Sequence, residues 1–131
     1  MQTTVVGSYP KIGPGTAVPN LRRAISRQQL GQITEQELRQ VEAEATREVL
    51  TEQARAGVDL VTDGHIRWDD PQTRFASEIA GFDINGLIRY FDTNTYYRQP
   101  VAQRELKWKG PMSVADYRFA AANSEKPVKA V

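Results

Sequence analysis

The chain has 131 residues with 17 basic and 16 acidic side chains, which gives a net charge of +1. This balance offers no electrostatic basis for binding nucleic acid or an anionic membrane surface. The chain contains no cysteine, so disulfides and thiolate metal ligands from this chain are excluded. The length predicts a single domain, residues 1–131, with its own core. We expect a cytoplasmic protein, because the N-terminus shows neither a basic leader nor a long apolar run.

Three short apolar segments, residues 3–6, 58–62 and 126–131, predict buried parallel strands. Between the first and second strands, residues 8–19 predict a loop because prolines and glycines interrupt any regular pattern. A strand, a helix and a second strand in succession are typical of parallel α/β architecture. The third strand has no helix after it to cover it, and such strands are normally covered on both faces. We therefore expect a truncated domain whose open edge self-associates or is covered by a second chain.

Helices are predicted between these strands. Residues 20–30 predict a short helix capped by Asn20. A longer helix through Ala56 is the clearest element, because Thr34 and Glu37 have the spacing of a capping box and apolar residues follow at helical intervals. A glycine directly after it is suited to the left-handed position that ends many helices.

The second half of the chain changes character. Residues 71–80 predict a helix that begins with a proline and is capped by Asp69 or Asp70. Residues 86–108 are rich in aromatic and β-branched side chains around an Asp-Thr-Asn turn, which predicts an antiparallel hairpin. Ser113, with an aspartate three residues later, opens a final helix.

A small polar motif follows the first predicted strand. Val6, Gly7 and Ser8 lie at its carboxyl end, where parallel α/β sheets and barrels place their ligands. The glycine allows a ligand to approach the backbone, and the Ser8 amide and hydroxyl could bind a carboxylate. The three residues taken alone favour the simpler interpretation, a turn that ends the strand.

A denser polar motif follows the second strand. Asp63, Gly64 and His65 precede Asp69 and Asp70, and His65 is the only histidine of the chain. An imidazole at this place could hydrogen-bond a substrate, relay a proton or bind a metal, although one histidine without cysteine is weak support for a metal site. The structural alternative is that the two aspartates are a helix cap and its solvated neighbour.

Aromatic side chains and an arginine cluster in residues 90–100. They suit a flat heterocycle or an anionic tail. They equally suit a hairpin that packs on the core, and the residues alone favour this structural interpretation.

Three segments in order, residues 3–10, 56–70 and 111–129, resemble the catalytic domain of the cobalamin-independent methionine synthases. The resemblance implies an α/β fold, a partial TIM (βα)8 barrel comprising about the first three strands, with an inserted β-hairpin. It also implies a zinc-dependent methyltransferase that makes methionine by methylating the homocysteine thiolate. The usual methyl donor is 5-methyltetrahydrofolate with a polyglutamate tail.

The resemblance also assigns residues to ligands. The positions expected to bind homocysteine are Val6, Gly7, Ser8 and His65. The first three would hold the carboxylate, whereas His65 stands where the family usually has a glutamate that binds the amine. Thr95 and Tyr96 fall where the family contacts the methyl donor, but the usual Arg-Cys pair is absent. A corrinoid or another methyl carrier is therefore an alternative donor.

Zinc is expected for the family, yet its His, Cys, Glu and Cys ligands have no counterpart in this chain, and a TIM barrel needs about 250 residues. We therefore expect small-molecule substrates but an inactive fragment. The alternatives are a non-catalytic binding or structural module derived from the barrel, and a corrinoid-linked or uroporphyrinogen decarboxylase-like barrel.

Overall fold

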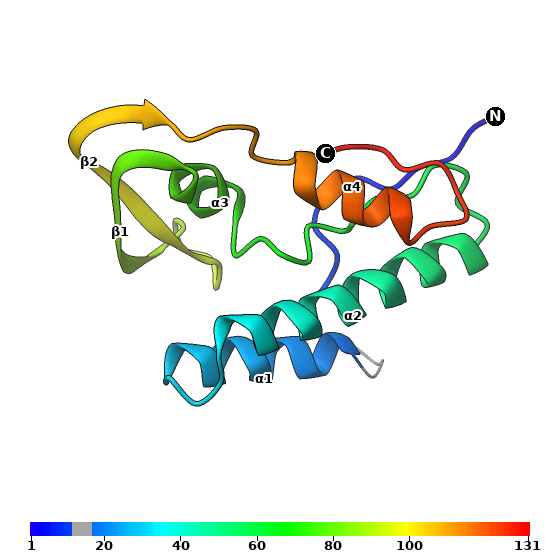
Figure 1. Cartoon of the computed structure of the whole chain (residues 1–131), viewed down its shortest axis with the longest axis horizontal. Helices are drawn as coiled ribbons and strands as arrows, with labels where there is room; N and C mark the ends of the chain where they lie inside the picture. The colour runs from blue at the N-terminus through cyan, green and yellow to red at the C-terminus, as the bar shows by residue number, and fades with distance from the viewer. Residues whose placement is uncertain (12–16) are drawn as a thin grey trace. The chain divides into compact units, whose positions relative to one another are not determined.

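The computed structural model describes residues 1–11 and 17–131 (Figure 1). Part of the predicted loop, residues 12–16, lies outside the described residues. The chain divides into two compact units. The first unit comprises Met1–Arg67 and Ser113–Val131, and the second comprises Trp68–Met112. That the chain is a single domain stays a prediction.

Helices α1 (Ala17–Gln29) and α2 (Glu35–Arg55) run side by side in the first unit (Figure 1). The predicted capping box of α2 is confirmed, because Thr34 Oγ1 accepts from the Glu37 N–H at 3.2 Å and Glu37 Oε2 accepts from the Thr34 N–H at 2.7 Å. The predicted start of α1 was wrong. Asn20 lies inside the helix, since a proline in the first turn removes no intrahelical hydrogen bond and lets the helix begin earlier.

The two helices bury a small apolar core. Leu21 from α1 meets Ala45 and Val49 from α2 and Ile66 from the following loop, and all four are buried. A second cluster of Leu50, Val61 and Ala120 packs α2 against the second predicted strand and helix α4 (Val114–Ala122). Both faces of α2 therefore contribute to the core of this unit.

The predicted parallel strands are present only as single bridges. Thr4 pairs with Leu60 and Val61 pairs with Val128, both in the predicted parallel orientation, so the second segment lies between the first and the third. Continuous strands were expected and were not found. Next to the first bridge, a side chain forms the hydrogen bond that a strand would supply: the Asp59 carboxylate accepts the Thr3 N–H at 2.8 Å.

The second unit contains α3 (Pro71–Ser77), β1 (Ile79–Arg89) and β2 (Tyr96–Trp108). Of the two predicted caps of α3, Asp69 and Asp70, the structure selects Asp70, whose Oδ1 accepts the Thr73 N–H at 2.8 Å. The helix was predicted to reach residue 80. It ends earlier because the next residues enter the sheet, where Ile79 pairs with Trp108.

The predicted antiparallel hairpin is confirmed, although β1 begins at Ile79 rather than Gly86. The ladder is interrupted opposite Gly81, because Ala80 pairs with Lys107 and Phe82 pairs with Ala102. Residues 103–106 therefore form an extended bulge, which raises the local twist of a two-stranded sheet.

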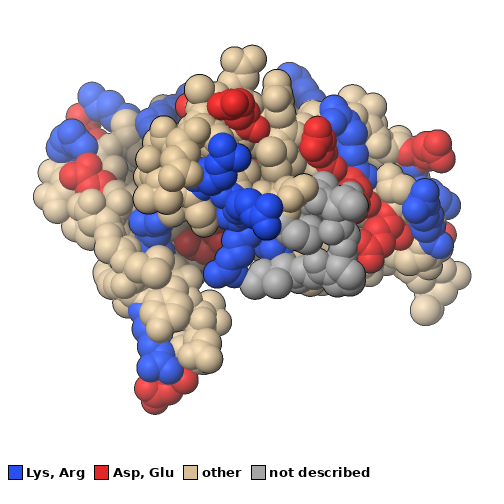
Figure 2. Space-filling model, turned by 90° about the horizontal axis from the view of Figure 1, so that it is seen from below, with Lys and Arg blue, Asp and Glu red and all other residues tan. Residues whose placement is uncertain are grey.

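The described residues contain no helix that is both long and apolar enough to cross a membrane. Figure 2 shows basic and acidic side chains interspersed over the visible face. This mixture agrees with the net charge of +1.

Candidate functional site

The ends of the first two predicted strands meet in the first unit. Ser8 Oγ lies 3.2 Å from His65 Nδ1, and the Tyr9 N–H donates to the Gly64 carbonyl at 2.8 Å. The paired residues are 57 positions apart along the chain. The structure therefore brings together two motifs that the sequence singled out separately.

Local backbone geometry explains why the second loop has its sequence. Gly64 has a φ of +66°, and a Cβ placed on it would lie 2.8 Å from Tyr9 Cβ and 3.0 Å from Val49 Cγ1. Only glycine fits this approach. His65 follows with a φ of 52°, a left-handed conformation that is uncommon for a residue with a side chain. The Asp63 carboxylate supports it by accepting the His65 N–H at 3.1 Å.

The members of this pair differ in exposure. His65 is buried, with 7% of its surface accessible, whereas Ser8 is exposed. Val6 is 90% exposed, and a Cβ on Gly7, whose φ is +89°, would meet no atom within 4 Å. The first motif thus offers open backbone and a hydroxyl to solvent, with an imidazole held against that hydroxyl.

Tyr9 anchors the first loop on α2. Burial, together with a hydrogen bond to the Glu52 carboxylate, raises the pKa of the Tyr9 hydroxyl to about 12. The tyrosine remains protonated and donates to Glu52 at every physiological pH. Because Tyr9 also donates its backbone N–H to Gly64, one residue connects both loops to the helix.

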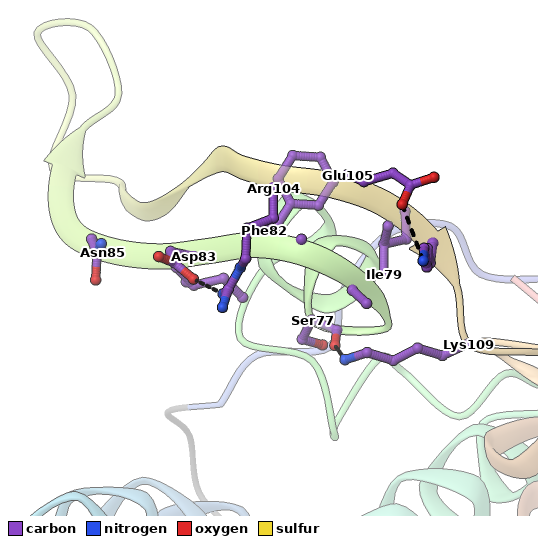
Figure 3. Close-up of a pocket in the computed structure, with 12 residues that line it drawn as sticks. Ser77, Ile79, Phe82, Asp83, Asn85, Arg104, Glu105 and Lys109 are labelled. Carbon is purple, nitrogen blue, oxygen red and sulfur yellow. Dashed lines mark hydrogen bonds and ion pairs between the residues drawn. The ribbon is translucent and has the colours of Figure 1, made fainter.

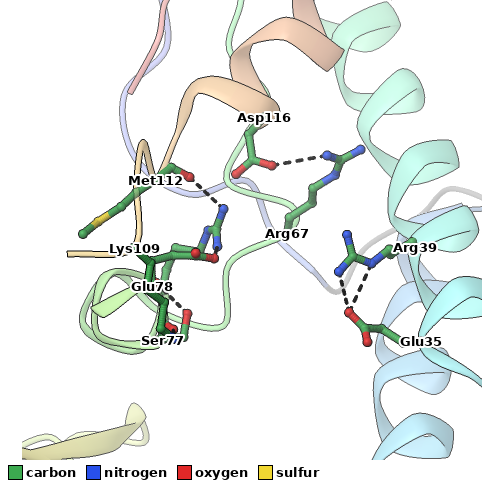
Figure 4. Close-up of polar contacts among 9 residues, drawn as sticks. Glu35, Arg39, Arg67, Ser77, Glu78, Lys109, Met112 and Asp116 are labelled. Atoms are coloured by element: carbon green, nitrogen blue, oxygen red, sulfur yellow. Dashed lines mark hydrogen bonds and ion pairs between the residues drawn. The ribbon is translucent and has the colours of Figure 1, made fainter. Parts of the chain in front are cut away.

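Arg67 anchors the second loop on α4. Its Nη1 lies 3.2 Å from the buried Asp116 carboxylate (Figure 4). Its guanidinium lies 4.3 Å from the centre of the Phe119 ring. Burial raises the pKa of nearby Glu42, although the positive charge of Arg67 opposes this rise. The loop that carries His65 is therefore fixed at its far end by charge and by an aromatic face.

The positions predicted to contact the methyl donor lie in the second unit. Thr95 is in the hairpin turn, where its carbonyl accepts the Tyr90 N–H at 2.8 Å. Tyr96 opens β2 and is 51% exposed. Tyr90 and Tyr97 stack edge to face with ring centres 6.1 Å apart, so this end of the hairpin presents an aromatic surface. Of the two aspartates ahead of α3, Asp70 serves as the cap and Asp69 is exposed.

A cavity of about 810 Å³ lies against the hairpin bulge in the second unit (Figure 3). Several of its polar side chains are engaged with one another or with the backbone. Arg104 pairs with Asp83 at 2.7 Å, and Lys109 donates to the Ser77 carbonyl at 2.9 Å. None of the predicted site residues lines it, so it is a product of the bulge and not the candidate site.

The described residues do not fit the zinc site that the resemblance implies. The chain has one histidine and no cysteine. Across residues 1–11 and 17–131, no group of three or more His, Cys, Asp or Glu side chains is placed to hold a metal ion. A thiolate and imidazole ligand set is therefore not supplied here.

Sequence reasoning did not anticipate the anchors of the two loops. Tyr9 lies in segment 3–10, which carries the family resemblance, but no local signal connects it with Glu52 on α2. Arg67 is two residues from His65 in the sequence, whereas its partners Asp116 and Phe119 lie about fifty positions later. Contacts between such distant positions leave no periodic signature in one sequence.

Comparisons with known proteins agree with the resemblance. The chain is 37% identical over 125 residues to a methionine synthase of Sulfurisphaera tokodaii, covering 95% of this chain and 35% of that protein. It is 30% identical over 128 residues to the methionine synthase of Thermococcus kodakarensis, covering 98% of this chain and 36% of that protein. The chain thus spans about a third of the length of these relatives.

A solved structure gives the same result for the fold. The B12-independent methionine synthase of Shewanella sp. W3-18-1, in complex with selenomethionine, superposes with a TM-score of 0.67 at 20% identity, covering 96% of this chain and 36% of that one. The family model for the catalytic domain of cobalamin-independent synthases matches residues 1–131. The chain therefore belongs to the cobalamin-independent synthase family, in the region of its catalytic domain.

Proposed function

We propose that this chain supplies part of the amino-acid site of a methionine synthase, the part that holds the backbone of homocysteine. The observation that carries the proposal is the meeting of Ser8 and His65 at 3.2 Å, at the ends of two parallel segments. Family membership and the names of the relatives support it. The neighbouring structure, which holds selenomethionine, supports an amino-acid ligand of this size.

The chemistry of the open motif suits a carboxylate. Gly7 leaves space above the backbone, so the amides of Gly7 and Ser8 could approach a small anion closely. The complete reaction would move a methyl group onto the homocysteine sulfur and yield methionine. The described residues of this chain would bind and orient the acceptor, since no group of side chains among them is placed to hold a metal that could activate its sulfur.

We further propose that the three parallel segments are the first strands of a TIM (βα)8 barrel. Their bridge order, with Leu60 and Val61 joining the first and third segments, supports this arrangement. The hairpin of the second unit would then be an insertion between the second and third strands. Self-association through an open strand edge, or cover by a second chain, stays a prediction.

Thr95 and Tyr96 are proposed as contacts for the methyl donor, either 5-methyltetrahydrofolate or another methyl carrier. The exposed aromatic surface at the hairpin turn supports a flat partner, because ring faces stack on planar groups. Titration with a folate and with a methylcobalamin would separate the two donors. If neither compound shifts the Tyr96 resonances, the hairpin is not part of the donor site.

The amino-acid proposal is tested by titrating the isotope-labelled chain with L-methionine and following amide resonances. We expect saturable shifts at Gly7, Ser8 and His65, with a dissociation constant on the order of 1 mM, because few groups hold the ligand. Ser8→Ala should weaken binding. Ser26→Ala, which changes an exposed helical serine of the same unit, is the matched control. Absence of shifts at the Ser8 motif in saturating methionine would refute the proposal.

The proposal also makes an expectation about catalysis. The 131 residues alone should bind no stoichiometric zinc and should not methylate homocysteine, since they hold one histidine and no cysteine. Zinc content after dialysis and methionine formation from a methylated folate are the two measurements. Either signal from the pure chain would overturn this part of the proposal.

A further inference from the structure

We propose that His65 is a positioning residue that acts on the ligand through Ser8. In this arrangement the Ser8 hydroxyl donates its proton to His65 Nδ1, and Ser8 Oγ presents its lone pairs to the ammonium group of the amino acid. The inference rests on the proposed function and deepens it, because it states which group of the ligand each residue recognises.

Exposure decides which member of the pair the ligand meets. His65 is 7% exposed, whereas Ser8 lies at the surface beside the open backbone of Gly7. A ligand that reaches this motif therefore contacts the hydroxyl before the ring. His65 is held in place by its left-handed backbone and by the hydrogen bond of its N–H to Asp63. A non-glycine residue kept in that conformation is a frequent mark of functional sites.

Hydrogen-bond inventory then gives the consequence. A hydroxyl has one proton and two lone pairs, and a neutral imidazole has one nitrogen that accepts. When the Ser8 proton is directed to Nδ1 across 3.2 Å, Oγ has no further proton to donate. Its lone pairs can then only accept a hydrogen bond from a donor. An ammonium group has three donors and no acceptor, so it is the group of an amino acid that fits.

Local charge favours the same assignment. The Asp63 carboxylate lies two residues from His65 and accepts its backbone N–H at 3.1 Å. Its negative charge next to the pair attracts an ammonium group and repels a carboxylate. The ligand carboxylate would instead face the amides of Gly7 and Ser8, where the backbone is open.

The test uses two substitutions that separate the ring nitrogens. Asparagine places its side-chain oxygen near the position of Nδ1, whereas glutamine reaches about as far as Nε2. Asparagine also tolerates the left-handed backbone of this position. If His65 acts through Ser8, His65→Asn keeps the acceptor for the hydroxyl and His65→Gln does not. If the ring touches the ligand through Nε2, the order is reversed.

Comparing two ligands isolates the contribution of the ammonium group to binding. Binding of L-methionine and of 4-(methylthio)butanoate, which lacks the amine, is measured by amide chemical shifts on the 131-residue chain. We expect Ser8→Ala and His65→Gln to lower the affinity for methionine roughly tenfold, because one charge-assisted hydrogen bond is lost. The affinity for the analogue should stay unchanged. His65→Asn should retain most of the methionine affinity.

The opposite outcomes are distinct. If the variants weaken the binding of both ligands equally, the effect is purely structural. If His65→Gln retains methionine binding and His65→Asn loses it, the ring contacts the ligand directly. Either outcome would overturn this inference but not the proposed function. No binding of either ligand by the unaltered chain would overturn the proposed function, and this inference with it.

A second measurement does not depend on the variants. Nitrogen-15 spectra of the histidine ring in the ligand-free chain report which nitrogen carries the proton. We expect an unprotonated, hydrogen-bonded Nδ1 and a protonated Nε2 in the neutral ring. A proton on Nδ1 would direct the Ser8 hydroxyl outward as a donor and would overturn the inference.

Discussion

The side chain of Gln53 pairs with the backbone of Thr62 in the way that a neighbouring strand would. Its Nε2 donates to the Thr62 carbonyl at 2.8 Å, and its Oε1 accepts the Thr62 N–H at 3.0 Å. Both residues are 2% exposed. The parallel bridges of this segment involve Leu60 and Val61. A helical side chain thus satisfies the next backbone groups and holds the start of the His65 loop against α2.

Replacing Gln53 by leucine should destabilise the first unit by about 3 kcal/mol, because two buried backbone groups lose their partners at once. Chemical denaturation with urea measures the change. Gln40→Leu, at an exposed position of the same helix, is the matched control and should change stability by less than about 0.5 kcal/mol. Similar midpoints for the two variants would show that water replaces Gln53 at Thr62.

Gly64→Ala should lower the free energy of unfolding by more than the positive φ of this residue alone explains. The new methyl group would lie 2.8 Å from Tyr9 Cβ, so the two loops must separate. Gly57→Ala is the control, since Gly57 also has a positive φ, +80°, but no atom within 4 Å of the added Cβ. We expect about 1 kcal/mol for the control and a further 1–3 kcal/mol for Gly64→Ala. Equal losses in thermal unfolding would show that the close approach carries no energy.

The ion pair between Arg67 and Asp116 should contribute measurably, unlike the exposed pair between Glu35 and Arg39 on α2 (Figure 4). Asp116 is buried, so loss of Arg67 leaves its charge without that partner in a poorly solvated place. A double-mutant cycle with alanine at both positions should give a coupling energy of about 2 kcal/mol. The same cycle at Glu35 and Arg39 should give about 0.3–0.5 kcal/mol. A coupling for Arg67 as small as that of the surface pair would contradict this expectation.

Alkaline pH should weaken the first unit through Tyr9. Its pKa is raised to about 12 in the folded chain, chiefly by burial and next by Glu52, against about 10 for a tyrosine in an unfolded chain. The stabilising contribution is therefore complete below about pH 10 and is lost as the pH rises toward 12. Tyr9→Phe should flatten the stability profile between these values.

Tyr117→Phe, which alters a tyrosine that is 41% exposed, serves as the control for the alkaline series. Urea midpoints collected from pH 9 to pH 12 for the three proteins would give the comparison. A Tyr9→Phe profile that still parallels the unaltered chain would assign the alkaline loss to other groups.

Structural features that depend on residues close together in the chain could be predicted from the sequence. The capping box of Thr34 and Glu37, an aspartate cap at residue 69 or 70 and the antiparallel hairpin were predicted, and all three are present, the cap being Asp70. Capping and turn formation depend on side chains that reach only two or three residues along the chain, so the pattern contains the whole interaction. Boundaries failed where a distant partner decided them, as at Ile79, which joins Trp108 in the sheet instead of extending α3.

The sequence by itself determined the α/β class, the family and the two polar motifs around Ser8 and His65. Only the tertiary structure decided that these motifs meet, with Ser8 Oγ 3.2 Å from His65 Nδ1. It also decided that the predicted strands are held by single bridges and by the Gln53 side chain. The physical reason is that such contacts join positions brought together by burial of the apolar core, and a single sequence records each position without its partner.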